Sequence, residues 1–482
     1  MRPARPHPRT AALAAALGSA LLLTLATAAA APAAPDRAPA TARTTAEAAA
    51  GGLTAQITRS SAWYTGYAAD VVVTNHGTAP VDGWTVEFDL PPGTTVGSHW
   101  SAARTQQGQH HRFTDVSWNA TVAPGAGQSF GFNASGLGHP LNCTVNGAPC
   151  DGGTPPADPP TDPPADPPAG TPVAVNGQLE VCGTKLCNEH GNPVQLRGMS
   201  SHGTQWYAQC LTDRSLDALA EDWKADVLRV STYVQEGGYE TNPRHYTDLA
   251  NRLIRQATDR GMYVIVDWHM LDPGDPMVNL DHARRFFTDI ARSNQGRNNV
   301  LYEIANEPNG VSWSRVKNYA EQIIPVIRGI DADAPVLVGT RGWSSLGVSD
   351  GSDESEVVAD PVDASNIMYT FHFYAATHDE KYLSALSRAA DRIPVFVTEF
   401  GTQNSAGEGA DDFQRSQRYL DLMAAKKIGW VNWNFSDDHR SGAVFTPGTC
   451  AADGPWTGTT SLKPAGAWIR DHLRTPDDFP TH

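Results

Sequence analysis

The sequence has few basic residues for its length and only six cysteines, and its apolar residues form no long run after residue 34. Lys and Arg number 36 against 52 Asp and Glu, so the formal net charge of the 482 residues is −16. Phosphate backbones and anionic lipid headgroups are bound through clustered Lys and Arg, and an acidic surface repels both. The composition therefore excludes nucleic-acid and membrane-surface functions.

Beyond residue 34, no stretch has the roughly 18 consecutive apolar residues that a transmembrane helix requires. The amino terminus combines three arginines, an apolar run from Leu13 to Leu25 and small residues up to Ala34, which is the layout of a secretory signal peptide. A membrane anchor is the alternative, but the run is rich in alanine and no charged flank follows it. We therefore expect residues 1–34 to be a signal peptide, residues 35–51 to be a disordered spacer, and the mature protein to be soluble and extracellular.

The six cysteines are expected to form disulfides before they bind a metal, because the chain is exported. Two close pairs each flank a turn that contains glycine, and the remaining two cysteines would close a very long loop. None of the spacings matches a zinc site, and we expect neither a metal nor another cofactor. The spacing favours this pairing without fixing it; the residues are Cys143, Cys150, Cys182, Cys187, Cys210 and Cys450.

A proline-rich stretch divides the chain. Residues 151–172 repeat Pro-Pro with Asp, Ala and Thr, a composition that gives a stiff, extended polyproline II spacer. A peptide ligand for a proline-reading domain is the alternative, but such partners are scarce outside cells. We therefore expect two folded domains, residues 52–150 and 173–475, on either side of this linker, as the length of the chain allows.

Residues 52–150 show the alternation that is typical of half-buried β-strands. Trp84, Val86, Phe88 and Leu90 alternate with polar residues, and Gly and Pro interrupt such runs at short intervals. This pattern predicts a small antiparallel β-sandwich with Trp84 in its core.

Three other tryptophans of this segment, Trp63, Trp100 and Trp118, lie among small and polar residues, outside the core alternation. Indole rings stack on the C–H faces of sugars, so an exposed row of them suits a flat polysaccharide; tryptophans scattered at sheet edges are the alternative. The runs GWTVEFDLPPG, SWNATVAPGAGQSFGFNASG and CTVNGAPC resemble the family 2 carbohydrate-binding modules. The resemblance implies that the three tryptophans form a cellulose-binding surface, although the chain lacks the cysteine near Leu53 with which many members link their termini.

Residues 173–475 repeat a strand followed by a helix. Between the apolar runs lie helical stretches such as Ser215–Lys224, where Ser215 can cap the first turn. Eight such units predict an α/β fold, a (β/α)8 barrel. A doubly wound sheet is the alternative, but no Gly-rich phosphate loop follows the first strand. The predicted strands begin near Val194, Val227, Tyr263, Val300, Pro335, Ile367, Pro394 and Trp430.

The active site of such a barrel lies at the carboxyl ends of its strands, and polar groups gather there in this sequence. Glu307 at the end of the fourth strand and Glu399 at the end of the seventh can face each other across the mouth, as cleavage of a glycosidic bond requires. Asp267 and Asp437 are weaker candidates, because the Asp side chain is shorter and Asp437 lies in a predicted loop. The other polar or aromatic residues at these ends are Ser201, His202, Arg229, Trp268, His269, Asn306, Trp343, His372, Tyr374 and Trp433.

Six runs follow one another at barrel spacing: LRGMSSHGTQW, YVIVDWH, LYEIANEPNG, MYTFHFYAATH, VFVTEFG and NWNFSDD. Together they resemble the family 5 glycoside hydrolases, in the subfamily rich in bacterial endo-β-1,4-glucanases. The resemblance implies that Glu307 is the general acid/base and Glu399 the nucleophile of a retaining mechanism. It implies a substrate-binding role for His202, Trp206, Arg229, Tyr233, His269, Asn306, His372, Tyr374 and Trp433, to which we add Trp343.

Two of these residues have a more specific implied role: Asn306 binds the sugar 2-hydroxyl, and Trp433 stacks under the sugar that is cleaved. Some relatives carry a basic residue where this chain has Asp438, so the resemblance does not carry over the contacts to the more distant glycone sugar.

We therefore expect a secreted, monomeric endo-β-1,4-glucanase that cleaves internal bonds of cellulose and soluble β-glucans with retention of configuration. A β-mannanase or xyloglucanase on the same barrel is the nearest alternative, since the fold does not fix the sugar. A non-catalytic cellulose-binding or wall-loosening protein is a third possibility, but such a protein has no need of a matched acid and nucleophile.

Overall fold

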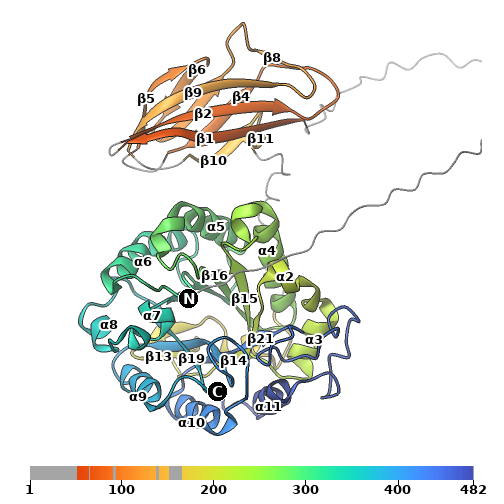
Figure 1. Ribbon diagram of the computed structural model, residues 1–482, viewed down its shortest axis with the longest axis vertical. Coiled ribbons are helices and arrows are strands. Elements are labelled where there is room, and N and C mark those ends of the chain that lie inside the picture. Colours follow the sequence, from red (N-terminus) through yellow and green to blue (C-terminus); the bar gives the residue numbers. More distant parts are fainter. Residues whose placement is uncertain (1–51, 64–65, 91–93, 137–139, 151–165, 481–482) are drawn as a thin grey trace, which may run out of the picture. The chain divides into compact units, whose positions relative to one another are not determined.

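The computed structural model describes residues 52–63, 66–90, 94–136, 140–150 and 166–480 (Figure 1). The predicted signal peptide, the predicted spacer and most of the predicted linker lie outside these residues. The described chain forms an antiparallel β domain and a closed parallel barrel surrounded by helices. The fold class expected from the sequence is therefore confirmed for both domains.

The amino-terminal domain consists mainly of two antiparallel sheets. The first contains, in spatial order, β1 (Leu53–Trp63), β2 (Gly66–Asn75), β9 (Gly127–Ser135) and β5 (Thr95–Trp100). The second contains β11 (Ala148–Pro149), β10 (Leu141–Val145), β4 (Thr85–Asp89), β7 (His110–Thr114) and β6 (Ala103–Gln107). A short pair, β3 (Val81–Asp82) and β8 (Thr121–Val122), completes the domain.

The core of this domain follows the alternation seen in the sequence. Trp84, Val86, Phe88 and Leu90 are all buried, as predicted. Trp84 stacks on Phe130 with the ring centroids 5.2 Å apart. Because each buried aromatic ring removes a large apolar area from water, this cluster is the main source of the domain's stability.

Three disulfides join the six cysteines. Cys143 and Cys150 are linked near the end of the β domain, and the carbonyl of Cys150 accepts a hydrogen bond from the Ala55 amide at 2.7 Å. This contact joins the two ends of the domain without a cysteine near Leu53. The second disulfide, Cys182–Cys187, spans the hairpin of β12 (Glu180–Cys182) and β13 (Lys185–Cys187), and the third, Cys210–Cys450, closes a separation of 240 residues.

The eight barrel strands lie in chain order, and the last pairs with the first in parallel, which closes the barrel. The first begins at Arg197 and not near Val194, because the Val194 amide donates to Leu186 in the preceding hairpin. The other predicted starts agree within one residue. The strands are β14 (Arg197–Ser201), β15 (Val227–Tyr233), β16 (Tyr263–His269), β17 (Val300–Glu303), β18 (Val336–Val338), β19 (Ile367–Tyr374), β20 (Val395–Gly401) and β21 (Trp430–Phe435).

Helices follow the strands around the barrel (Figure 1). The helix predicted at Ser215–Lys224 begins at Asp213, because Thr212 is its N-cap: Thr212 Oγ1 accepts from the Ser215 amide, and Ser215 Oγ accepts from the Thr212 amide. The helices are α1 (Pro172–Asn176), α2 (Thr204–Tyr207), α3 (Asp213–Glu221), α4 (Pro243–Asp259), α5 (Leu280–Ser293), α6 (Trp313–Arg328), α7 (Arg341–Ser344), α8 (Ser355–Ala359), α9 (Glu380–Ala389), α10 (Phe413–Lys426) and α11 (Pro464–Leu473), with short 3-10 turns at Ala208–Cys210, Tyr239–Thr241, Pro276–Asn279 and Val348–Asp350.

The chain segments on either side of the barrel pack against its amino-terminal end. The Val173 amide in α1 donates to Gly261 at 3.0 Å. After α11, the Thr475 carbonyl accepts a hydrogen bond from Arg197 at 2.8 Å, and the Asp477 carboxylate binds the same guanidinium. Phe479 then packs on the buried cluster that includes Leu196 and Val431. The contacts of the barrel therefore continue past residue 475.

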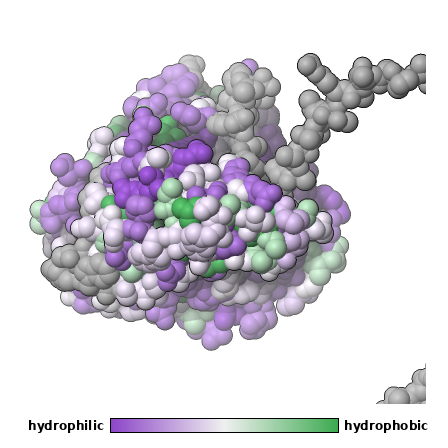
Figure 2. All heavy atoms as spheres, turned by 90° about the horizontal axis from the view of Figure 1, so that it is seen from above, coloured by the Kyte–Doolittle hydropathy of each residue, from purple (hydrophilic) through white to green (hydrophobic). Residues whose placement is uncertain are grey.

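No helix within the described ranges is long and apolar enough to cross a membrane. On the face drawn in Figure 2, hydrophobic residues are scattered among hydrophilic ones.

One polar side chain lies inside the aromatic core of the β domain. His111 on β7 is opposite Phe88 on β4, is 0% exposed, and has no hydrogen-bond partner for either ring nitrogen among the described residues. Burial, with a smaller contribution from the charge of Arg104, lowers the pKa of His111 to about 4. The imidazole is therefore neutral when the domain is folded at neutral pH.

Because an unfolded histidine has a pKa near 6.5, the unfolded domain binds more protons than the folded one between about pH 6.5 and 4. We expect the melting temperature of a 52–150 fragment to fall as the pH is lowered through this window. His111→Phe should flatten the dependence, whereas His76→Gln, at an exposed histidine of the same domain, should retain it. Melting curves at several pH values would test this; an equal slope in wild type and His111→Phe contradicts it.

Candidate active site

A cavity of about 1220 Å³ opens at the carboxyl ends of the barrel strands. It is lined by groups from the loops and strand ends that the sequence singled out. Of the predicted catalytic and substrate-binding residues, all line the cavity except Arg229 and Asn306, which lie behind it. The predicted residues that line it are Glu307, Glu399, His202, Trp206, Tyr233, His269, Trp343, His372, Tyr374 and Trp433.

Arg229 on β15 carries a permanent positive charge behind the cavity, and it is 0% exposed. Its Nη1 lies 3.2 Å from Glu399 Oε2 and its Nη2 lies 3.0 Å from Asp267 Oδ2. Nη2 also donates to Asn306 Oδ1 at 2.6 Å, so the Asn306 amide is held by the guanidinium behind the cavity wall. Burial alone would lower the pKa of Arg229, but the surrounding carboxylates raise it.

Glu399 accepts two hydrogen bonds at the mouth of the barrel. Besides Arg229 Nη1, the Tyr374 hydroxyl donates to Glu399 Oε1 at 2.6 Å. Burial would raise the pKa of Glu399, but the charges of His372 and Arg229, together with the Tyr374 hydrogen bond, outweigh burial and lower it. Glu399 is therefore ionised at neutral pH.

Glu307 lies four residues beyond the end of β17, so it is in the loop and does not end the fourth strand as predicted. His372 Nδ1 is 2.9 Å from Glu307 Oε1. Burial raises the pKa of Glu307, and the nearby charge of Glu399 adds to this effect although His372 opposes it. The two carboxyl groups are thus shifted in opposite directions by their surroundings.

One oxygen of Glu307, one oxygen of Glu399 and a ring nitrogen of His372 all lie within 4.8 Å of one another. The same three residues could be considered as metal ligands. However, hydrogen bonds to carboxylates outweigh burial and raise the pKa of His372 to about 9, and a protonated imidazole has no lone pair for a metal. The arrangement fits proton transfer between carboxyl groups better than metal binding.

Aromatic rings form one side of the cavity. The Trp433 ring contacts the rings of His269 and His202, with centroids 5.2 Å and 5.1 Å away. His269 Nδ1 is 2.6 Å from Asp267 Oδ2, and burial together with the charge of Arg229 lowers its pKa well below the usual value, so the ring is neutral. Tyr233 stacks on His269 at 4.1 Å. These rings all line the cavity, and aromatic rings supply the apolar surface on which sugars stack.

Two further tryptophans stand at the rim, where they are about half exposed: Trp206 in α2 and Trp343 in α7. Trp343 has a left-handed backbone with φ of 56°, which is uncommon for a bulky side chain. Its amide donates to the Pro308 carbonyl at 3.0 Å, and this bond ties the α7 loop to the loop that carries Glu307.

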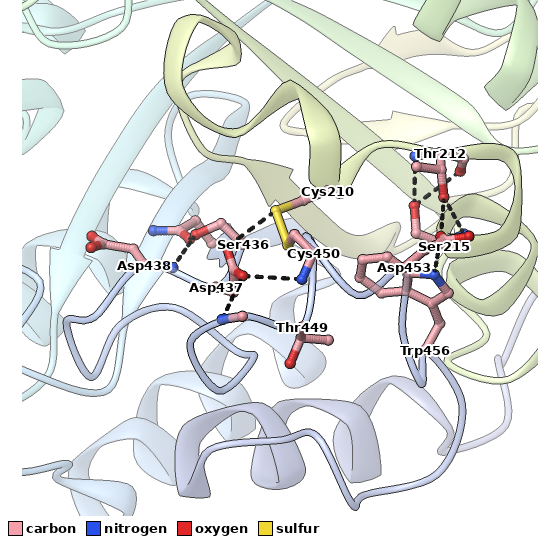
Figure 3. The surroundings of a disulfide bond; sticks show 12 residues. Cys210, Thr212, Ser215, Ser436, Asp437, Asp438, Thr449, Cys450, Asp453 and Trp456 are labelled. Carbon is pink, nitrogen blue, oxygen red and sulfur yellow. Dashed lines mark hydrogen bonds between the residues drawn. A yellow bond between two sulfur atoms is a disulfide. The ribbon is translucent and has the colours of Figure 1, made fainter.

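A disulfide fixes two of the loops that line the cavity (Figure 3). Cys210 follows the loop of His202 and Trp206, and Cys450 lies in the loop after β21. Asp437 Oδ2 accepts from the Cys450 and Gly448 amides at 3.0 Å, as Figure 3 shows for Cys450. Asp437 therefore shapes the loop and does not line the cavity.

The neighbouring residue Asp438 does line the cavity. Its Oδ2 lies 3.7 Å from His202 Nε2 and 3.5 Å from Arg440 Nη1. A hydrogen bond with Asp438 contributes, after burial and the charge of Asp438, to a pKa of about 12 for Tyr207. Asp438 thus supplies a negative charge to the cavity wall beside His202.

Two buried residues of the site were missed by the strand-end argument. Glu303 closes β17 and is 0% exposed, and Thr398 precedes Glu399 on β20. The Thr398 hydroxyl donates to Glu303 Oε1 at 2.7 Å. The sequence does contain a signal for Glu303: it is the one charged residue in the apolar run 300–305. A charge that is buried needs a partner, so a carboxylate in such a run points to a buried ion pair.

The structure describes two of the three tryptophan side chains that are predicted to form the cellulose-binding surface of the β domain. Trp118 is 68% exposed and Trp100 is 42% exposed, whereas the side chain of Trp63 lies outside the described part of the structure. The Trp100 ring rests on Gly131: a Cβ at Gly131 would come within 2.2 Å of it. Gly131 therefore lets one face of the indole lie on the sheet while the other faces outward.

Comparison with known proteins gives matches for both domains. A family described as "Cellulase (glycosyl hydrolase family 5)" matches residues 187–439, and one described as "Cellulose binding domain" matches residues 53–150. Endoglucanase E-5 of Thermobifida fusca is 58% identical over 434 residues, which are 89% of this chain and 93% of that protein. Endoglucanase CelA of Streptomyces lividans is 51% identical over 439 residues, 90% of this chain and 94% of that protein.

Solved structures agree for the barrel. The catalytic domain of Thermobifida fusca endoglucanase Cel5A (E5) superposes with a TM-score of 0.63 at 64% identity, over 64% of this chain and 100% of that domain. A variant of the same domain has been solved in complex with cellotetraose, with the same TM-score and identity.

The hydrogen bond from Tyr374 to Glu399 generates a prediction about pH dependence. Tyr374→Phe removes a donor to the ionised carboxylate, so the pKa of Glu399 should rise and the acid limb of kcat/KM should move up by about 1–2 pH units. Tyr302→Phe is the matched control, because its hydroxyl donates to Asp331 at 2.9 Å outside the cavity. Hydrolysis of a soluble β-glucan from pH 3 to 8 measures both; an unmoved acid limb in Tyr374→Phe contradicts the assignment.

Proposed function

The chain belongs to glycosyl hydrolase family 5 and carries a cellulose binding domain, and on this premise we propose that it is an endo-β-1,4-glucanase, a cellulase that hydrolyses internal bonds of cellulose. The observation that carries the proposal is the pair Glu307 and Glu399, whose oxygens approach within 4.8 Å and whose pKa values shift in opposite directions. A retaining glycosidase needs one protonated and one ionised carboxyl group at about this separation.

In the first step, Glu399 is the nucleophile. Its ionised carboxylate attacks the anomeric carbon, the bond to the leaving oxygen breaks, and a covalent glycosyl ester forms. Glu307 is the general acid: Oε1 lies 2.9 Å from His372, so Oε2 is the oxygen that carries the proton to the leaving sugar. Tyr374 and Arg229 hold the nucleophile ionised before the attack.

In the second step, Glu307 changes from general acid to general base. Once Glu399 is esterified it carries no charge, so one cause of the raised pKa of Glu307 is removed. The Glu307 carboxylate then takes a proton from the water that attacks the anomeric carbon, and the ester bond to Glu399 breaks, which restores the ionised carboxylate. Two inversions at one carbon give net retention of configuration.

The aromatic side chains of the cavity wall favour a substrate that is an uncharged sugar chain with flat faces. Trp433 provides the stacking surface under the sugar that is cleaved, and His202 with Tyr233 extends it. Trp206 and Trp343 continue apolar contact at the rim, as an internal position within a longer chain requires.

The remaining parts of the chain fit an extracellular role on solid substrate. We assign residues 1–34 to a signal peptide, residues 35–51 to a spacer, residues 151–172 to a linker, and the two domains to residues 52–150 and 173–475, with residues up to Phe479 packing on the barrel. The β domain brings the barrel to the cellulose surface through Trp63, Trp100 and Trp118, which raises the local concentration of substrate. The protein acts as a monomer without a cofactor, and a β-mannanase or xyloglucanase remains the alternative.

The two carboxyl groups can be separated by experiment. Glu399→Gln should reduce turnover on every substrate by several orders of magnitude, because no glycosyl ester can form. Glu307→Ala should instead spare aryl cellobiosides with good leaving groups, which need little acid assistance, and azide should restore part of its second step. Equal losses on good and poor leaving groups for Glu307→Ala would remove Glu307 from the acid role. The substrate is tested separately: if mannan or xyloglucan releases more reducing sugar than cellulose does, the protein is a β-mannanase or a xyloglucanase.

The tryptophan surface has its own test. Trp100→Ala and Trp118→Ala should each weaken adsorption to insoluble cellulose by about 1–3 kcal/mol, the order known for aromatic stacking on nucleobases, with little change in melting temperature. Trp84→Ala should cost about 3–5 kcal/mol of folding stability, because this ring is in the core. Adsorption isotherms and melting curves of the 52–150 fragment separate the two effects. Unchanged adsorption of both exposed variants contradicts the proposed surface.

A further inference from the structure

Glu303 is a fully buried carboxylate that does not line the cavity. Its two oxygens bond in different directions: Oε2 accepts from Arg229 Nε at 2.6 Å, and Oε1 accepts from the Thr398 hydroxyl at 2.7 Å. Resting on the roles proposed for the two reacting carboxyl groups, we propose that Glu303 is a positioning residue that holds both of them in place through two separate chains of hydrogen bonds.

The first chain runs to the nucleophile. The guanidinium of Arg229 is planar and rigid, so anchoring its Nε on Glu303 fixes the direction of Nη1. Nη1 is the atom that lies 3.2 Å from Glu399 Oε2. Loss of the Glu303 charge would therefore leave Arg229 free to tilt, and the nucleophile would lose its alignment.

The second chain runs to the acid/base and sets the direction of every hydrogen bond in it. An ionised Glu303 can only accept, so Thr398 must donate its single proton to Glu303. The hydroxyl oxygen can then only accept from His372 Nε2, which lies 2.9 Å away. With Nε2 protonated and the ring charged, Nδ1 donates to Glu307 Oε1 and leaves Oε2 to carry the transferable proton.

The charges in this cluster support the same role. Hydrogen bonds and the charge of Arg229 outweigh burial and lower the pKa of Glu303 to about 2, so it is ionised throughout the working range. Burial would lower the pKa of His372, but the carboxylates Glu303 and Glu307 raise it to about 9. The titratable or charged groups around His372 are Glu303, Glu307, Glu399, Arg229, Asp267, His269 and His378.

Thr398→Val tests the second chain alone. The substitution keeps the shape of the side chain and leaves the contact between Glu303 and Arg229 in place, but it removes the hydroxyl. We expect kcat/KM for aryl cellobiosides with poor leaving groups to fall about 10- to 100-fold, the order seen when a residue that orients a functional group is removed. Substrates with good leaving groups should lose much less, and Thr398→Ser, which restores the hydroxyl, should recover most of the activity.

Glu303→Gln tests both chains. It should reduce kcat/KM about equally on good and poor leaving groups, since nucleophile and acid are both affected. Glu354→Gln is the matched control, because this buried carboxylate binds Arg388 at 2.6 Å away from the cavity and its loss should leave both activities unchanged. If Glu303→Gln does not fold, as melting curves would reveal, Thr398→Val still decides the second chain.

A direct readout separates positioning from a purely structural role. In full-length protein labelled with ¹⁵N-histidine, the pKa of His372 should fall below about 9 in Glu303→Gln, which removes one of the carboxylates that raise it, and stay near 9 in Glu354→Gln. An unchanged His372 pKa in Glu303→Gln, or an equal loss on both leaving-group types in Thr398→Val, would overturn the proposal. Wild-type activity of Glu303→Gln together with an inactive Glu399→Gln would overturn only this inference, whereas an active Glu399→Gln would overturn the proposed function itself.

Discussion

The buried guanidinium of Arg229 is the charge around which the catalytic end of the barrel is built. It reaches carboxylates on three other strands, Asp267 on β16, Glu303 on β17 and Glu399 on β20, at 3.0, 2.6 and 3.2 Å. A buried ion that loses a partner costs several kcal/mol, so these contacts constrain one another. A closed parallel barrel makes them possible, because it brings the ends of its strands to one level around a common axis. The ionised state of Glu399 is thus a consequence of the fold as much as of its own side chain.

The sequence predicts the barrel well because most of its strands are largely apolar runs and its longer helices are amphipathic. Seven strand starts agree within one residue, and the eighth differs because Val194 pairs with a neighbouring hairpin that leaves no periodic signal. The strand-end argument likewise finds Glu399 and His372, which stand on the strands themselves. It passes over Glu303, which ends β17, because the fourth strand was predicted to end at Glu307, four residues later in the loop.

Loop geometry is the part that the sequence does not predict. Trp343 was expected near the end of the fifth strand, but its left-handed backbone and its bond to Pro308 depend on how two loops meet. Asp438 acquires its place in the same way, from the disulfide between Cys210 and Cys450 and from the neighbouring Asp437. These contacts join loop residues that are 13 to 240 positions apart, so a local sequence pattern does not predict them.

Tryptophan illustrates how neighbours decide what one residue type does. Trp84 can be buried because its one polar group is satisfied: the ring Nε1 donates a hydrogen bond to the backbone carbonyl of Asn119 at 2.8 Å. The side chain of Asn119 also binds the Ser101 carbonyl and the Val116 amide, each at 2.8 Å, and so joins the turn after Trp100 to the turn that carries Trp118. An indole can stay exposed at low cost only if the backbone beneath it is fixed, because a mobile platform would have to be ordered again each time it met a surface. The buried asparagine and the bare backbone of Gly131 supply that rigidity, so the exposed tryptophans depend on the same core that contains Trp84.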